Sequence, residues 1–192
     1  AEKFQHIIGG SADLDGSNGT TNFASSYGDF SSSNPKGRNI AFGVREFPMG
    51  AIMNGIALYG NHFPFGGTFL VFSDYVRSAI RLSAIQKLHV MYEFTHDSIF
   101  VGEDGPTHQP VEHTMSLRNI PNLLVFRPAD ALETFYCFKT IMKNQKNPSA
   151  ILLTRQKLPK LNISEDKIEE GVNKGAYICL LYTSDAADEI TG

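Results

Sequence analysis

An apolar run at 88–92, Leu-His-Val-Met-Tyr, precedes the polar stretch Phe-Thr-His-Asp-Ser-Ile-Phe-Val-Gly-Glu-Asp-Gly-Pro-Thr-His-Gln-Pro at 94–110. The apolar run predicts a buried strand, and the glycines and prolines after it predict a loop of fixed backbone geometry. Five ionisable side chains lie in this loop: His96, Asp97, Glu103, Asp104 and His108. Since α/β sheets bind ligands in loops at the carboxyl ends of strands, we expect a ligand site here; a solvated surface loop is the alternative.

Apolar runs of strand length alternate with helical patterns along the rest of the chain. Strands are predicted at 7–8, 40–44, 68–72, 88–92, 122–126 and 149–153. Helices are predicted at 48–59, 74–88, 111–117 and 130–143, and a long loop at 15–38. This alternation predicts an α/β domain with a mainly parallel sheet of about six strands flanked by helices.

A chemically distinctive residue follows the carboxyl end of several predicted strands. These residues are Asp13, Glu46, Phe72, His96, Asp104 and Arg155. Right-handed crossovers bring the carboxyl ends of parallel strands to one edge of a sheet. The sequence therefore predicts that these residues share one rim.

Composition argues against several classes of function. The chain has 192 residues, of which 42% are hydrophobic, and 17 basic against 20 acidic residues. The hydrophobic fraction is enough for a core. The nearly balanced charges predict neither a basic face for nucleic acid nor a polybasic membrane patch. No apolar run is long enough to span a bilayer, and the first residues do not resemble a signal peptide. Cys137 and Cys179 have no metal-ligand spacing and predict no disulfide framework, so we expect a cytoplasmic protein.

Six motifs resemble the pyrimidine-binding domain of transketolase, in the same order along the chain. They are Gly-Gly-Ser-Ala-Asp-Leu at 9–14, Gly-Val-Arg-Glu at 43–46, Gly-Thr-Phe-Leu-Val-Phe-Ser-Asp-Tyr at 67–75, the loop at 94–110, Arg-Pro-Ala-Asp at 127–130 and Thr-Arg-Gln-Lys-Leu-Pro at 154–159. The resemblance implies the thiamine-diphosphate-binding fold, with a pyrimidine-binding domain at 1–178. Residues 179–192 depart from the family pattern, and we expect a disordered or artefactual tail there.

The resemblance implies part of a transketolase, which transfers a two-carbon ketol unit between sugar phosphates with thiamine diphosphate, in the pentose phosphate pathway and the Calvin cycle. It also implies a homodimer, in which another domain from the partner subunit binds the diphosphate and its Mg²⁺. That domain and the family's C-terminal domain have no counterpart in this sequence, so we expect a fragment or a split subunit, inactive alone. Deoxyxylulose-phosphate synthase and the beta subunit of 2-oxo acid dehydrogenases fit the motifs less well. A non-catalytic domain of this fold would be expected to lack Glu46 or the histidines, which are present.

On the cofactor side, Glu46 matches the family's catalytic, cofactor-activating glutamate. A carboxyl group bonded to the pyrimidine ring nitrogen favours the imino tautomer, whose exocyclic nitrogen can take the proton of the thiazolium carbon. The alternative is a glutamate favoured by a helix N-terminus. Phe69, Phe72 and Tyr75 match the aromatic pocket around the pyrimidine; Phe72 is the stacking candidate, and core packing is the alternative for Phe69. Asp13 falls near the cofactor at the subunit interface in the family.

On the substrate side, His96, Asp104 and His108 match the substrate-binding residues of the family loop. The two imidazoles are candidate catalytic groups, which can donate to sugar hydroxyls or to the ketol oxygen and relay protons near neutral pH. The three side chains could instead bind a metal, but their spacing is not that of a zinc site, and no metal ligand is predicted within the chain. Arg155 and Ser17 match the phosphate-anchoring residues, because a guanidinium fork suits phosphate.

Overall fold

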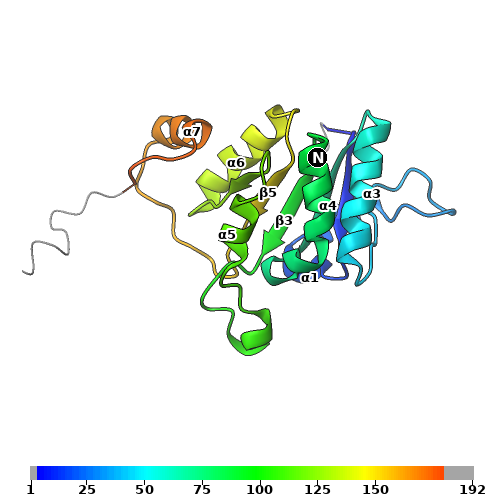
Figure 1. Ribbon diagram of the computed structural model, residues 1–192, viewed down its shortest axis with the longest axis horizontal. Coiled ribbons are helices and arrows are strands. Elements are labelled where there is room, and N and C mark those ends of the chain that lie inside the picture. The colour runs from blue at the N-terminus through cyan, green and yellow to red at the C-terminus, as the bar shows by residue number, and fades with distance from the viewer. Residues whose placement is uncertain (1–3, 180–192) are drawn as a thin grey trace, which may run out of the picture.

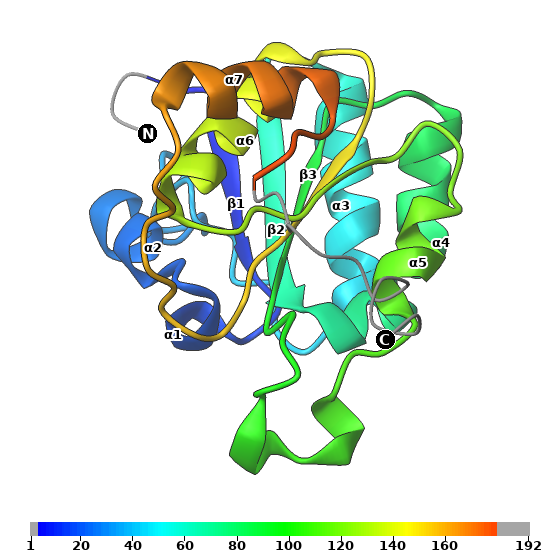
Figure 2. The same cartoon turned by 90° about the vertical axis from the view of Figure 1, so that its left-hand side faces the viewer.

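Five parallel strands form one sheet in the computed structural model, which describes residues 4–179. The strands are β1 (Ile7–Ser11), β2 (Phe63–Phe69), β3 (Met91–Thr95), β4 (Leu124–Phe126) and β5 (Ser149–Leu152). Their order is β1-β2-β3-β5-β4, and every neighbouring pair is parallel. All carboxyl ends therefore lie at one edge, with β3 in the centre. The loop after β3 projects from that edge (Figure 2).

Helices cover both faces of the sheet (Figure 1). One face carries α3 (Glu46–Tyr59), α4 (Ser73–Ile85) and α5 (His113–Arg118). The other carries α2 (Thr21–Tyr27), α6 (Ala131–Lys143) and α7 (Glu165–Lys174). The short helix α1 (Asp15–Asn18) and the 3-10 turns η1 (Leu70–Phe72), η2 (Gly102–Asp104) and η3 (Pro106–His108) lie in the connections at the carboxyl edge.

The sheet separates two hydrophobic clusters, as the alternation of side chains along a strand requires. Tyr92 and Phe94 of β3 are fully buried with α3, α4 and α5, whereas Met91 packs on the other face with α6 and α7. Gly50 lets α3 approach α4 closely, because a Cβ there would lie 2.7 Å from side-chain atoms of Ala79 and Val76. Fully burying a large apolar side chain contributes roughly 1.5–3 kcal/mol, so these clusters hold the rim in place.

The α/β class, the parallel sheet and its flanking helices agree with the sequence prediction, and β5 and α6 lie close to their expected positions. The described residues contain five strands where about six were expected, which is a minor difference. Segment 40–44 is not a strand: Gly43 has a φ of 68°, and only the preceding Asn39 forms bridges, to Gly9 and Asp29. Glu46 therefore begins α3 and does not end a strand.

Three other boundaries differ from expectation. The strand expected at 68–72 is β2 at Phe63–Phe69, followed by η1, because Gly66 and Gly67 lie within the strand where neighbouring side chains leave no room for a Cβ. The strand expected at 88–92 is displaced to Met91–Thr95, after Lys87 in a left-handed conformation. The expected loop at 15–38 contains α1 and α2, and α7 was not predicted.

The expected tail at 179–192 lies, apart from exposed Cys179, outside the described residues. Within the described part of the chain, no helix combines the length and apolar character needed to cross a bilayer.

Candidate functional site

Two clefts adjoin at the carboxyl edge of the sheet. The aromatic cleft, of about 490 Å³, is lined by Ala12, Asp13, Leu14, Val44, Glu46, Phe69, Phe72, Tyr75 and His108. The arginine cleft, of about 520 Å³, is lined by Gly16, Ser17, Asn18, Gly19, Thr95, His96, Leu153, Thr154 and Arg155. The rings of Phe69 and His96 stack with their centroids 3.6 Å apart, so the two clefts share a wall. Nine of the ten predicted site residues line one cleft or the other; Asp104 lies beside them, on η2.

Two strands are followed by residues of left-handed conformation, at which the chain turns along the carboxyl edge of the sheet. Asp13, after β1, and His96, after β3, both have a φ of 62°. Aspartate and histidine tolerate this conformation better than most side chains, which explains their use at these turns. Asp13 is exposed at the mouth of the aromatic cleft, whereas His96 is only 8% exposed.

The aromatic cleft has a carboxylate beside stacked rings. Glu46 is half-buried at the first turn of α3 and also lines the cleft. Its position therefore agrees with both interpretations, a helix N-terminal glutamate and a ligand-binding carboxyl group. Phe69 is buried, and its ring is nearly parallel to that of Phe72, with centroids 5.8 Å apart. Tyr75 is 64% exposed and continues the row, 6.0 Å from Phe72. Phe69 thus serves both the core and the cleft wall, while Phe72 and Tyr75 remain accessible to a ligand.

The loop histidine His108 closes the aromatic cleft from η3. Its ring lies edge-on to Phe72, with centroids 5.5 Å apart, and its Nδ1 lies 2.9 Å from the hydroxyl of Thr107. Burial lowers the pKa of His96, an effect that the nearby Asp104 carboxylate opposes and that Arg155 and His108 reinforce. His96 is therefore a neutral imidazole at neutral pH, between the carboxylate of the loop and the arginine cleft.

The predicted phosphate anchor Arg155 has a carboxylate partner. Its Nη2 lies 2.5 Å from Oε1 of Glu103 in the loop, and the Glu103 side chain is 77% exposed. Ser17, the second predicted anchor, is exposed in the same cleft. A guanidinium with an exposed carboxylate partner can exchange it for a more highly charged anion, so the pair does not remove Arg155 from the cleft.

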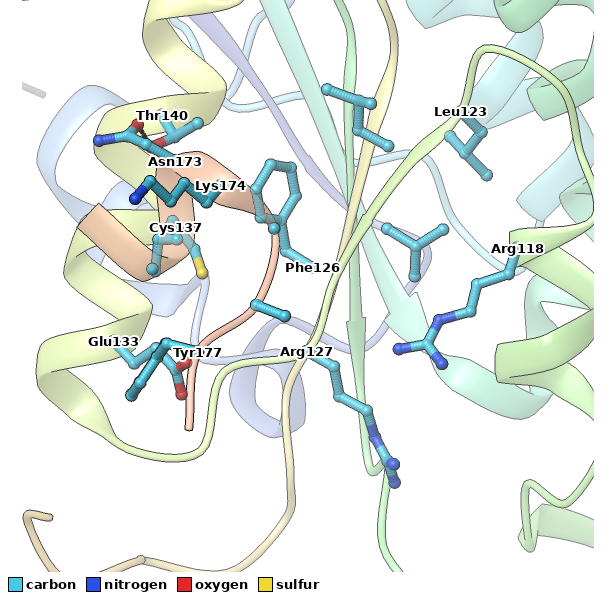
Figure 3. Close-up of a pocket in the computed structure, with 16 residues that line it drawn as sticks. Arg118, Leu123, Phe126, Arg127, Glu133, Cys137, Thr140, Asn173, Lys174 and Tyr177 are labelled. Carbon is cyan, nitrogen blue, oxygen red and sulfur yellow. Dashed lines mark hydrogen bonds between the residues drawn. The ribbon is translucent and has the colours of Figure 1, made fainter. Parts of the chain in front are cut away.

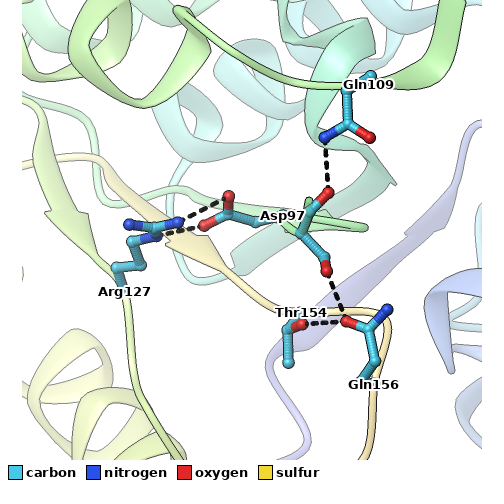
Figure 4. A network of polar contacts seen from close by, with 6 residues as sticks. Asp97, Gln109, Arg127, Thr154 and Gln156 are labelled. Atoms are coloured by element: carbon cyan, nitrogen blue, oxygen red, sulfur yellow. Dashed lines mark hydrogen bonds and ion pairs between the residues drawn. The ribbon is translucent and has the colours of Figure 1, made fainter. Parts of the chain in front are cut away.

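Polar contacts that the sequence did not predict fix the loop at both ends (Figure 4). Arg127 donates two hydrogen bonds to the Asp97 carboxylate, through Nε at 2.5 Å and Nη2 at 3.2 Å. The Ser98 hydroxyl donates to Gln156 Oε1 at 2.6 Å, and Gln109 Nε2 donates to the Ser98 carbonyl at 2.7 Å. The sequence signal that could have identified these contacts is that Arg127 and Gln156 belong to the motifs at 127–130 and 154–159.

A third hollow, of about 420 Å³, lies away from the rim between β4, α6 and α7 (Figure 3). It contains none of the predicted site residues. Burial raises the pKa of its Cys137 thiol to about 12, so this buried cysteine is a poor nucleophile. His96, Asp104 and His108 are not among the described residues whose ligand atoms all lie within 4.8 Å of one another. Among described residues, the group with ligand atoms close enough to share an ion is Asp74, Glu112 and His113, near α4 and α5.

Residues 1–160 match the profile of the family described as transketolase, pyrimidine binding domain. The chain belongs to this family. It is 52% identical over 178 residues to the transketolase of Aquifex aeolicus, covering 93% of this chain and 26% of that protein. It is 53% identical over 178 residues to the transketolase of Bacillus subtilis, again covering 93% of this chain and 26% of that protein. The chain thus spans about a quarter of these curated transketolases and corresponds to part of an enzyme.

Solved transketolase structures carry the same fold. A structure from Pichia stipitis, in complex with sedoheptulose-7-phosphate, matches with a TM-score of 0.81 and 46% identity, over 86% of this chain and 25% of that one. Campylobacter jejuni transketolase matches with a TM-score of 0.78 and 47% identity, over 84% and 24%. A split-gene transketolase, described as an inactive beta4 tetramer, matches with a TM-score of 0.68 and 30% identity, over 86% and 50%. The transketolase pyrimidine-binding domain is therefore shown by sequence and by fold.

Proposed function

We propose that this chain supplies the aminopyrimidine-binding and substrate-binding side of a transketolase active site, which transfers two-carbon ketol units between sugar phosphates with thiamine diphosphate. The observation that carries the proposal is the shared wall of Phe69 and His96, which sets a carboxylate-and-aromatic cleft beside an arginine cleft. One cleft suits a flat heterocycle, and the other suits a polar, phosphorylated chain. The sedoheptulose-7-phosphate complex of a 46% identical relative supports the same substrate class.

The residues of the aromatic cleft fit the aminopyrimidine part of the cofactor. Phe72 and Tyr75 offer accessible ring faces, and Glu46 offers a half-buried carboxyl group that would meet the pyrimidine ring nitrogen. The described lining contains no lysine or arginine for a diphosphate. We therefore assign the diphosphate and its Mg²⁺ to a separate domain, contributed by the partner subunit of a homodimer. Thiamine diphosphate, when bound, supplies the carbanion chemistry for breaking and making the carbon–carbon bond of the ketol unit.

The chain's own residues would then divide the remaining work. Glu46 holds the pyrimidine in the required tautomer, and Phe72 orients the ring. His96, Asp104 and His108 contact the hydroxyl groups near the reacting carbon, where a neutral imidazole can exchange protons. At the far end of the substrate, Arg155 and Ser17 bind the phosphate. The row of aromatic rings at the cleft wall limits water around the reacting groups.

The proposal extends to the organisation of the protein. We assign residues 1–178 to the pyrimidine-binding domain, and residues 179–192 fall outside this assignment. The complete enzyme is a homodimer that acts in the cytoplasm, in the pentose phosphate pathway or the Calvin cycle. Support comes from the domain match and from relatives named transketolase.

The test uses a full-length transketolase in which this chain replaces the equivalent domain of the Bacillus subtilis relative. Glu46→Gln should remove most of the activity at saturating cofactor while leaving the fold intact, because an amide can meet the ring nitrogen but cannot share a proton with it. The matched control is Glu112→Gln, an exposed glutamate outside both clefts. A loss for Glu46→Gln of less than tenfold, roughly 1.4 kcal/mol of barrier, would contradict the assignment.

A further inference from the structure

The side-chain amide of Gln156 joins two of the segments that form the rim. Its Oε1 accepts hydrogen bonds from the hydroxyls of Ser98, at 2.6 Å, and Thr154, at 2.9 Å (Figure 4). Its Nε2 donates to the carbonyl oxygen of Phe100 at 2.6 Å. Ser98 and Phe100 belong to the loop after β3, whereas Thr154 belongs to the segment after β5. One half-buried side chain thus holds three points, two of them in the loop.

The orientation of this amide is determined by its partners. A carbonyl oxygen can only accept, so the group that faces Phe100 must be the nitrogen. The amide oxygen then faces the two hydroxyls, and each of them donates its single proton to it. The Ser98 oxygen is left as an acceptor, and it accepts from the Phe100 amide at 2.9 Å. Gln156, Ser98 and Phe100 therefore form a closed ring of three bonds, in which no member can reverse without losing a partner.

The two ends of the proposed substrate site lie on the same two segments. Arg155 lines the arginine cleft from the segment 154–156, whereas Asp104 and His108 lie in the loop, on η2 and η3. The pairing of β3 with β5 fixes where the two segments begin. Asp104 and His108 lie well beyond the end of β3, so contacts outside the sheet must set their distance from Arg155.

Within residues 4–179, two side chains bond the segment 154–156 to the loop. One is Gln156, and the other is Arg155, through its ion pair with the exposed Glu103. A phosphate that binds Arg155 competes with Glu103 for the guanidinium, so this second link weakens when the ligand arrives. The partners of Gln156 are two hydroxyls and a carbonyl group, none of them charged, so an anion does not compete for them. Gln156 is therefore the link that persists once phosphate is bound.

We propose that Gln156 is a positioning residue, which keeps the loop at a fixed distance from phosphate-bound Arg155 and so makes turnover selective for phosphorylated donors. Phosphate bound at one end then orients the reacting carbon at the other end, because the anchor and the loop are held together. A donor without phosphate contacts only the loop end and makes no use of this link. The inference rests on the proposed function and deepens it, since it names the residue that converts phosphate binding into turnover.

Kinetics in the full-length enzyme described above separate this role from a purely structural one. Gln156→Met keeps nearly the same side-chain length and removes the three hydrogen bonds. It should lower kcat for a sugar phosphate roughly tenfold with a much smaller change in KM, and leave kcat for hydroxypyruvate within about twofold of wild type. Equal losses of kcat for the two donors would overturn the proposal, because they would show a general loss of order in the loop. An unchanged kcat for the sugar phosphate would overturn it as well.

A double variant and a matched control test the link to the phosphate anchor. With Arg155→Ala in place the phosphate is no longer held, so adding Gln156→Met should lower kcat for the sugar phosphate by less than about twofold; a further loss of roughly tenfold would contradict the link. Gln109→Met is the control, because Gln109 donates to the Ser98 carbonyl at 2.7 Å but forms no hydrogen bond with the segment 154–156 in the described chain. It should leave the ratio of kcat values for the two donors as in wild type, and a ratio shifted as far as in Gln156→Met would argue against the proposal.

The link is also measurable without cofactor or substrate, by amide hydrogen exchange of the 192-residue chain. The Phe100 amide should be protected in wild type, because its acceptor, the Ser98 hydroxyl, is held by Gln156. Gln156→Met should speed its exchange roughly fivefold, and so should Gln156→Glu, whose carboxylate cannot donate to the Phe100 carbonyl. Amide spectra report whether each variant is folded. An unprotected Phe100 amide in wild type, or unchanged exchange in a folded variant, would refute the proposal and leave the cofactor assignment standing, which Glu46→Gln tests separately.

Discussion

Glu93 provides a test of the packing of the central strand. It lies on β3 opposite Gly67 of β2 and Ile151 of β5, with its side chain on the face covered by α6 and α7, two residues beyond Met91. Burial raises the pKa of its carboxyl group from 4.5 to about 7. The described residues offer it no hydrogen bond or ion pair that would offset this. The folded protein therefore keeps this carboxyl protonated over a range in which the unfolded chain ionises it.

The sign of the effect on stability follows from that difference. Below pH 4.5 the carboxyl is protonated in both states and the free energy of unfolding has its full value. Between pH 4.5 and about 7 only the unfolded chain loses the proton, so stability falls as the pH rises. Each pKa unit corresponds to about 1.36 kcal/mol, which sets an upper limit of about 3 kcal/mol for the loss. Partial exposure of the side chain makes the expected value smaller.

The experiment compares Glu93→Gln with the wild-type chain by urea unfolding at several values between pH 4 and pH 8. The amide cannot ionise, so the variant should gain about 1–3 kcal/mol relative to wild type between the two ends of this range. The difference between the two proteins is the relevant quantity, because the lowered pKa values of His89 and His96 give both proteins a slope of opposite sign. Asp166→Asn, at an exposed carboxylate of α7, is the control and should show no such trend. A pH-independent difference for Glu93→Gln would refute the reasoning.

Three further outcomes are expected. In the full-length enzyme, Arg155→Ala should raise KM for phosphorylated donors by the equivalent of about 1.5–3 kcal/mol and affect the non-phosphorylated donor hydroxypyruvate far less; equal penalties, measured by steady-state kinetics, would exclude a phosphate anchor. The chain alone should show no ketol transfer and only weak binding of thiamine diphosphate in calorimetry with Mg²⁺, and tight Mg²⁺-dependent binding would contradict the assignment of the diphosphate to another domain. Asp130→Ala should lower the free energy of unfolding by about 1–2 kcal/mol in urea titrations, because Oδ1 accepts from the Glu133 amide at the start of α6 and Oδ2 from the Leu161 amide; Asp130→Asn should lose less, and equal losses would argue against capping.

The parts of the fold that the sequence predicted well are those whose local pattern and tertiary role agree. Helix α6 follows an aspartate cap, and β5 is an uninterrupted apolar run that becomes fully buried. Strand β2 was misplaced because Pro64, Gly66 and Gly67 are local signals for a turn, whereas close neighbours from α3 and β1 require glycine within the strand. Helix α7 did carry a signal, since Ile168 and Val172 are buried four residues apart.

The candidate site also has a part that the sequence could predict and a part that it could not. The residues that line the two clefts could be picked out because they stand in motifs of fixed spacing. The contacts that support them could not, because they join distant segments: Asn18 and Thr95 are 77 positions apart, and Glu103 and Arg155 are 52 apart. Nothing local marks such a pair, and only the assembled sheet brings its members together.

The ion pair of Glu103 and Arg155 has a consequence for ligand choice by net charge. A ligand that binds this guanidinium competes with a carboxylate counterion that is already in place. A ligand bearing a single negative charge gains little from that exchange, whereas a phosphate dianion gains the second charge. Glu103 lies on η2, so its displacement by the dianion would also shift the loop that contains Asp104 and His108. We therefore expect the cleft to discriminate between monoanions and dianions more sharply than an unpaired arginine would.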